Sequence, residues 1–178
     1  MIATIVPTAK QLGTLYQNRY IDILSCPSGN NGKTTFIKRL VYKYGKQVLF
    51  IPVSDNPTQV LSAFVNFVED NGFIGPDIVI IDVPRAIDYG QRDPVTIIKL
   101  HNIAEIIRSG LVTTSMYGKY KMVMVKNPRI LLCTNYDYDE DPKSILWCPP
   151  NRFVVHKLEK FGEHFIIPTL IHSLPVNS

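Results

Sequence analysis

The chain has 178 residues, and it contains no apolar run close to the roughly 20 residues that cross a bilayer, so we expect one domain and no membrane partner. The formal net charge of +4 permits a polyanionic partner without requiring one. The three cysteines lack close paired spacing, which argues against a disulfide framework and against a zinc site. The first residues lack the basic segment and the long apolar core of a signal peptide, and we therefore expect an intracellular protein.

Apolar periodicity predicts strands that alternate with helices along most of the chain. We expect, in chain order, a helical segment over 7–18, a strand over 20–24, a helix over 34–44, a strand over 47–52, a helix over 58–71 and a strand over 77–82. These are followed by a helix over 94–109, short strands over 111–114 and 122–125, a strand over 129–134, and final strands over 153–158 and 164–167.

This alternation predicts an α/β fold, in which helices cover both faces of a mostly parallel central sheet, as in the three-layer sandwich of P-loop NTPases. Residues 1–19 form a short N-terminal helical segment in this interpretation, and residues 20–178 form a single domain. Four consecutive branched aliphatics in the strand over 77–82 indicate burial on both faces, as in a central parallel strand.

Polar signals lie at the ends of three of the predicted strands. They are the Gly32-Lys33-Thr34 sequence, Asp82 and Asn135. Ligands of parallel sheets bind beyond the carboxyl ends of the strands, so we expect these three signals to meet in one site.

The first signal lies in a loop that follows a strand and opens a helix, which is the context of a phosphate-binding loop. Two glycines allow the backbone to curl and direct its N–H groups at phosphate oxygens. The lysine would reach the terminal phosphates of ATP, and the threonine hydroxyl would bind Mg²⁺. The nucleotide-binding residues in this interpretation are Pro27, Ser28, Gly29, Asn30, Asn31, Gly32, Lys33, Thr34 and Thr35.

The spacing of this loop departs from the usual pattern, which has a glycine where this chain has Pro27. Asn30 and Asn31 tolerate left-handed backbone geometry, so a longer turn is feasible. The competing interpretation is an ordinary surface turn.

Asp82 ends a buried strand, where a P-loop NTPase places the carboxylate that binds Mg²⁺ through water. No second carboxylate follows it, because the next residue is Val83. The residue that activates water therefore stays open, with Glu105, Asp88 and Asp77 as candidates.

Asn135 follows another buried strand and can hold the attacking water or the γ-phosphate. Arg152 lies on a loop after the last core element, from which an arginine can reach the site of a neighbouring subunit and stabilise transition-state charge. Arg85 and Arg129 are weaker candidates for the same role.

Three stretches resemble superfamily 3 helicases, and most closely the replication-initiator (Rep) proteins of small circular single-stranded DNA viruses of the nanovirus and alphasatellite type. They are residues 27–35, residues 80–85 with their Asp-Val-Pro-Arg ending, and residues 131–135. The nanovirus-type loop is similar to Gly-Pro-x-Gly-x-x-Gly-Lys-Thr, one residue longer than usual, which accounts for the spacing. This chain departs from that pattern at Cys26, where the family has its first glycine.

The resemblance implies an ATP- and Mg²⁺-dependent 3′-to-5′ DNA helicase that unwinds DNA during rolling-circle replication, in the host nucleus and as a homo-oligomeric, hexameric ring. It makes Asn135 the sensor of the γ-phosphate and Arg152 the arginine finger. It also places a DNA-contacting β-hairpin over 115–121. Lys119 and Lys121 would contact phosphates of single-stranded or duplex DNA there, and Tyr117 or Tyr120 would stack on a base.

Such Rep proteins also carry a nicking domain with a His-x-His pair, which this chain lacks. We therefore expect either a helicase-only fragment or a homologue without the nuclease. Three alternatives stay open: an RNA helicase of the picornavirus type, a small-molecule P-loop kinase, and a degenerate P-loop module for nucleic-acid binding or assembly.

Overall fold

The structure is a computed structural model that describes residues 20–27, 32–53, 56–84, 94–116, 119–138, 148–157, 159–161 and 164–166. No helix in these ranges is long and apolar enough to cross a membrane. The helix predicted over 7–18 lies outside the described residues, as do the candidates Arg85 and Asp88.

The helices of the described chain are α2 (Lys33–Tyr44), the short 3-10 helix η1 (Gly45–Gln47), α3 (Gln59–Asp70) and α5 (Pro94–Arg108). The strands are β1 (Ile21–Ser25), β2 (Val48–Pro52), β3 (Ile78–Asp82), β4 (Leu111–Met116), β5 (Lys119–Met124), β6 (Arg129–Thr134), β7 (Phe153–Lys157), β8 (Glu159–Phe161) and β9 (His164–Ile166). Each corresponds to a predicted element apart from η1 and β8, which periodicity did not indicate.

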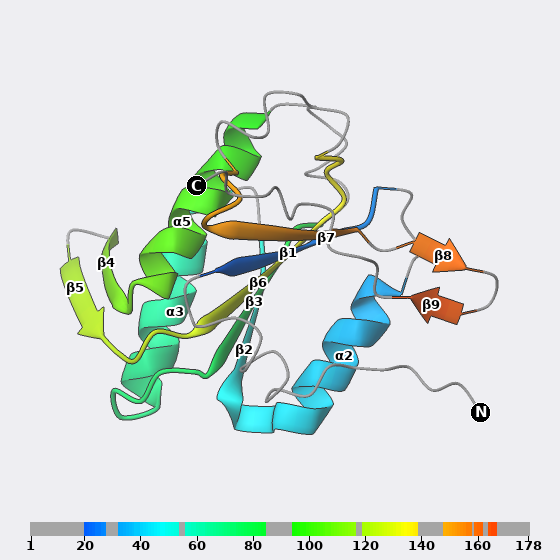
Figure 1. Cartoon of the computed structure of the whole chain (residues 1–178). Coiled ribbons are helices and arrows are strands. Elements are labelled where there is room, and N and C mark those ends of the chain that lie inside the picture. Colours follow the sequence, from blue (N-terminus) through cyan, green and yellow to red (C-terminus); the bar gives the residue numbers. More distant parts are fainter. Residues whose placement is uncertain are drawn as a thin grey trace.

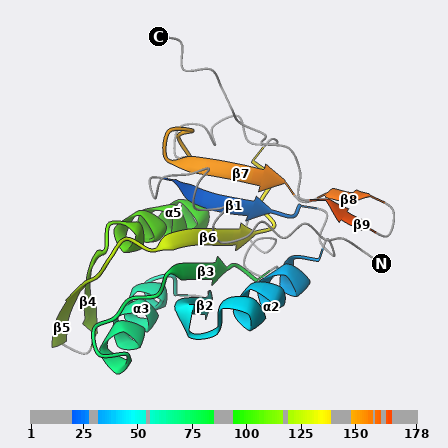
Figure 2. The same cartoon turned by 60° about the horizontal axis from the view of Figure 1, so that its bottom comes forward.

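Five strands form one parallel sheet in the order β2-β3-β6-β1-β7. The α/β fold with a mostly parallel central sheet is thus confirmed. β6 lies between β1 and β3 and pairs with both, although it comes much later in the chain (Figures 1 and 2). As a result, the strands that precede the three polar signals of the sequence are direct neighbours.

Helices cover the sheet on both faces, with α2 on one side and α3 and α5 on the other (Figure 2). Adjacent residues of β3 show the alternation, because Ile80 packs in the core under α2 and Ile81 in the core under α3 and α5. Both are fully buried. The continuous aliphatic run of β3 therefore follows from its central place in a doubly covered sheet.

The hairpin β4–β5 is longer than predicted, since its antiparallel pairing extends from Leu111↔Met124 to Met116↔Lys119. The polar residues near its tip weaken the apolar alternation on which the sequence prediction depended. Gly110 starts this hairpin with a φ of 74°, and a Cβ there would lie 2.3 Å from the carbonyl oxygen of Val125. Only glycine fits this conformation and this close backbone approach.

Candidate nucleotide site

The carboxyl edge of the parallel sheet brings the predicted signals together. In the register of the sheet, Ser25 lies beside Thr134 and Asp82 beside Cys133. Backbone hydrogen bonds continue past the strand ends, from Cys26 N to Thr134 O at 2.9 Å and from Val83 N to Cys133 O at 2.8 Å. The strand that leads into the phosphate-loop sequence, the strand of Asp82 and the strand before Asn135 thus end at one level.

Lys33 and Asp82 meet at this edge. The Lys33 ammonium lies 3.2 Å from Asp82 Oδ1 and donates a hydrogen bond of 3.4 Å to the carbonyl oxygen of Val83. Both side chains are mostly buried, with 14% and 23% of their surfaces exposed. A partly dry environment strengthens an ion pair, and it also strengthens the attraction of Lys33 to any phosphate that enters.

Gly32 shapes the start of α2. It caps the helix in the left-handed conformation, with φ 78° and ψ 10°, and its carbonyl oxygen accepts a hydrogen bond from Phe36 N at 2.9 Å. No side chain caps the first turn of α2 in the described structure, and that turn holds no acidic residue. Its backbone N–H groups therefore suit an anion, which the helix dipole also favours. Ser28, Gly29, Asn30 and Asn31 lie outside the described residues.

The carboxylate of Asp82 has spare acceptor capacity. Its Oδ1 atom is buried and accepts no hydrogen bond from the described residues, apart from its ion pair with Lys33. Thr34, one residue beyond Lys33, is exposed. A carboxylate and a hydroxyl are hard oxygen donors that fit Mg²⁺, which takes its other ligands from phosphates and water. No group of three or more His, Cys, Asp or Glu side chains in the described chain would hold a metal without such help.

Cys26 occupies the position at which the nanovirus-type loop has its first glycine. Its side chain is only 1% exposed and packs in the cluster under α2 with Leu24 and Ile37. Burial raises the pKa of the thiol to about 11, an effect that nearby Lys33 partly offsets, so the thiol is neutral at physiological pH. Cys26 is therefore a packing residue. Cys133 and Cys148 are likewise free and buried.

The turn after β6 is held in place from both sides. Ser25 Oγ donates a hydrogen bond of 2.7 Å to the carbonyl oxygen of Tyr136, and Tyr136 N donates one of 3.0 Å to Thr134 Oγ1. Asn135 lies in this turn and is partly buried. Its backbone position is thus tied to the end of β1, from which the phosphate-loop sequence departs.

Other predicted candidates lie at the opposite, amino edge of the sheet. Asp77, Arg129 and Arg152 each directly precede or begin a strand there, as the hydrogen bonds from Arg129 N to Asp77 O (2.9 Å) and from Ile21 N to Arg152 O (2.8 Å) show. A strand of this length separates the two edges by roughly 16 Å, at about 3.3 Å per residue. Asp77 is therefore wrong as a candidate for activating water in this site, and Arg129 does not reach the site of its own chain.

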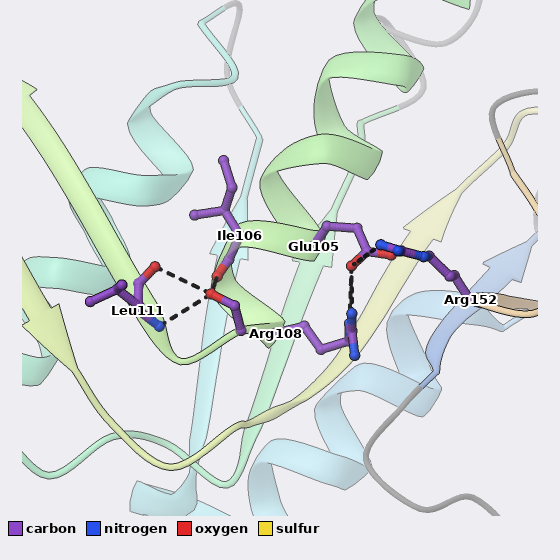
Figure 3. A network of polar contacts seen from close by, with 6 residues as sticks. Glu105, Ile106, Arg108, Leu111 and Arg152 are labelled. Atoms are coloured by element: carbon purple, nitrogen blue, oxygen red, sulfur yellow. Dashed lines mark hydrogen bonds and ion pairs between the residues drawn. The ribbon is translucent and has the colours of Figure 1, made fainter.

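Glu105 is excluded for the same reason, because it lies near the end of α5 at the amino edge. Its Oε2 atom accepts hydrogen bonds from Arg108 Nη2 at 2.7 Å and Nε at 3.2 Å, and Arg152 Nη1 lies 3.5 Å away (Figure 3). The Arg152 side chain remains 57% exposed. Sequence reasoning missed this cluster; helical spacing of Glu105 and Arg108 was the available signal.

The residues of the β4–β5 hairpin that were predicted to contact DNA do not all point outward. The Lys121 ammonium lies 2.6 Å from Glu69 Oε2 on α3 and therefore faces the body of the domain. The side chain of Lys119 and all of Tyr117 lie outside the described residues. Tyr120 lies on the opposite face of β5 and is 70% exposed. The predicted contact of Lys121 with phosphates would thus require it to leave Glu69.

A buried histidine lies on α5. His101 on α5 is only 2% exposed and lies between Tyr138 and Phe153, with ring centroids at 5.9 Å and 4.6 Å. Its Nε2 lies at hydrogen-bond distance, 2.9 Å, from the Tyr138 hydroxyl. This stack joins α5 to the segment that follows the Asn135 turn.

Neither a scan against protein-family models nor a search of curated proteins gives a match for this chain.

Proposed function

We propose that this chain is the ATPase domain of a Rep-type DNA helicase, which hydrolyses ATP at the carboxyl edge of its sheet and moves along DNA. The observation that carries the proposal is the approach of the Lys33 ammonium to Asp82, at 3.2 Å, beside the turn that holds Asn135. A lysine at a helix start, a strand-end carboxylate and a strand-end amide are the groups that nucleoside triphosphate hydrolysis requires.

The roles of these residues follow from their positions. The ammonium of Lys33 would leave Asp82 for the β- and γ-phosphates, while the N–H groups at the start of α2 bind phosphate oxygens. Mg²⁺, bound through Thr34 and through water to Asp82, would neutralise charge on the phosphates. Asn135 would orient the attacking water or the γ-phosphate.

Arg152 supports an assembled form of the enzyme. Because it lies at the amino edge, it does not reach the site of its own chain, yet most of its side chain is exposed. In a head-to-tail ring it would complete the site of the next subunit and stabilise the charge of the transition state. A hexameric ring, and a place of action in the host nucleus, belong to this proposal through the resemblance.

The test is ATP hydrolysis by the wild type and by Lys33→Ala, with and without single-stranded DNA, over a range of protein concentrations. We expect activity that rises with DNA and with concentration, and a loss of about 10³-fold or more in Lys33→Ala. Lys38→Ala is the matched control, because Lys38 is an exposed lysine of the same helix.

Three outcomes would contradict the proposal in different ways. Equal activity of Lys33→Ala and Lys38→Ala would remove the assigned site. Stimulation by RNA and not by DNA would favour the picornavirus-type helicase. DNA binding without any hydrolysis, even at high protein concentration, would favour a degenerate module.

A further inference from the structure

A cavity lies at the amino edge of the sheet, away from the candidate nucleotide site. Its volume is about 380 Å³, and it is bordered by the end of α2, η1, the segment before β3 and the β5–β6 connection. Its polar wall includes Tyr44, Gln47, Asp77, Lys126, Asn127 and Arg129. Neither the family resemblance nor the proposed hydrolysis gives this cavity a role.

The charges around the cavity favour an anion. Lys126 and Arg129 face one carboxylate, that of Asp77, within the wall itself. Lys43 adds a further cation, since its ammonium lies 5.3 Å from the centre of the Tyr44 ring. Lys46 in η1 is exposed beside the wall residue Gln47. Four cations around one carboxylate produce a positive potential that attracts phosphate groups.

The remaining wall groups suit a nucleobase. Tyr44 contributes an aromatic side chain to the wall, and the amide side chains of Gln47 and Asn127 carry both donors and acceptors. The carboxylate of Asp77 would repel a phosphate but accept a hydrogen bond from an exocyclic amine or a sugar hydroxyl. A cavity of about 380 Å³ lies at the small end of the range for ligand sites and suits one nucleotide unit.

An exposed track leads from the hairpin to this cavity. Tyr120, Met122 and Met124 are 70%, 59% and 79% exposed, and they alternate along one face of β5. Lys126 continues the same alternation into the cavity wall and is exposed as well. Figure 1 shows the hairpin standing out from the body of the domain. Bases that pass along such a track would meet apolar side chains, and the phosphates would meet Lys126 at its end.

We propose that the amino-edge cavity binds one nucleotide unit of a single-stranded nucleic acid that follows the exposed face of β5. The phosphate lies against Lys126 and Arg129, and the base lies against Tyr44. The identity of the partner rests on the proposed function. The position of the binding site rests only on the cavity and on the charges around it.

The test is the affinity of the full chain for a fluorescent oligothymidylate, measured by anisotropy over a series of salt concentrations and without ATP. We expect Lys126→Glu to weaken binding by roughly 10-fold. The slope of log affinity against log salt concentration should become shallower by the amount that about one phosphate contact contributes. Tyr44→Leu, which keeps an apolar side chain, should weaken binding roughly 5- to 10-fold through the loss of stacking. Lys99→Glu is the matched control, because it makes the same charge change at an exposed site on α5.

Each outcome of these measurements supports or overturns the assignment of the cavity. If Lys126→Glu binds the oligonucleotide as Lys99→Glu does, the inference is overturned. If Lys126→Glu weakens oligonucleotide binding but Tyr44→Leu leaves it unchanged, the base does not lie in the cavity, and the cavity assignment is overturned. The same measurements in a Lys33→Ala background separate the two proposals, since loss of hydrolysis with an intact effect of Lys126→Glu would leave the cavity assignment standing.

Discussion

The two edges of the central sheet carry similar side chains in different surroundings. At the carboxyl edge, Lys33 faces Asp82 within a partly buried site, and at the amino edge, Arg108 and Arg152 face Glu105. Both are ion pairs between cations and a carboxylate. They differ in their surroundings, because only the first lies beside a glycine-capped helix start and the ends of three adjacent strands. A charged side chain therefore belongs to the candidate site because of the edge of the sheet on which it lies, and not because of its residue type.

The largest expected effect comes from joining the two edges across a subunit interface. Lys33→Ala and Arg152→Ala should each lower ATP hydrolysis by about 10³-fold or more, since each lacks one group of a shared site. When the two inactive variants are mixed in equal amounts, roughly a quarter of the interfaces should pair an intact Lys33 with an intact Arg152. Hydrolysis by the mixture should then recover to roughly that fraction of wild type.

The measurement is steady-state hydrolysis as a function of mixing ratio. A mixture as inactive as its components would show that Arg152 does not act across an interface. It would then be only a partner of Glu105.

A smaller loss is expected at the carboxylate of the carboxyl edge. Asp82→Asn keeps the shape of the side chain but removes its charge, and it should lower kcat by about 10²- to 10³-fold. Asp70→Asn, an exposed carboxylate at the end of α3, should have less than about a threefold effect. Comparable losses in the two variants would remove the assigned role of Asp82.

The same substitution at a glycine of each edge should separate function from stability. Gly110→Ala should lower the free energy of unfolding by about 3 kcal/mol, because it combines a left-handed backbone with a Cβ that meets Val125 O. Gly32→Ala introduces backbone strain of about 1 to 2 kcal/mol, since the φ of Gly32 is 78°, and it should also weaken ATP binding. Urea unfolding and nucleotide titration of both variants measure the two quantities. Weaker nucleotide binding in Gly110→Ala alone would reverse the assignment of the edges.

The smallest effect concerns Cys26, which directly follows β1. Burial raises its pKa from 9.0 to about 11, so the unfolded chain releases this proton at a lower pH than the folded chain does. Stability should therefore fall as the pH rises from 9 to 11, by about 2 kcal/mol from this thiol. Cys26→Ala should show a correspondingly shallower decline in urea unfolding over this range. An unchanged slope would mean that the thiol does not titrate in this way.

The sequence predicted much of the fold, because its signals were local. Apolar alternation and helical spacing located the strands and helices to within a few residues, and the four aliphatics of β3 indicated a central strand. The hairpin was predicted too short, since its pairing continues into polar residues whose pattern carries no burial signal.

The candidate site was predicted only in part. Asp82 and Asn135 lie at the carboxyl ends of predicted strands, and the direction of parallel strands alone could assign both to one edge of the sheet. Asp77 begins the predicted strand over 77–82, so the same argument could already have placed it at the amino edge, whereas Glu105 could not be excluded without knowing where the end of α5 lies in space. The Lys121–Glu69 ion pair joins residues far apart in the chain, and no local pattern indicates such a partner.

The sequence by itself determined the alternation of strands and helices and the order of the three polar signals, because these depend on local propensity and on spacing along the chain. The tertiary structure alone decided that β6 lies between β1 and β3. That placement brings Lys33 to Asp82, and it depends on the packing of two separate cores against the faces of one sheet. The tertiary structure also decided which charged side chains share the candidate site and which lie at the far edge. The ends of separate helices and strands take their positions in space only when these elements pack together.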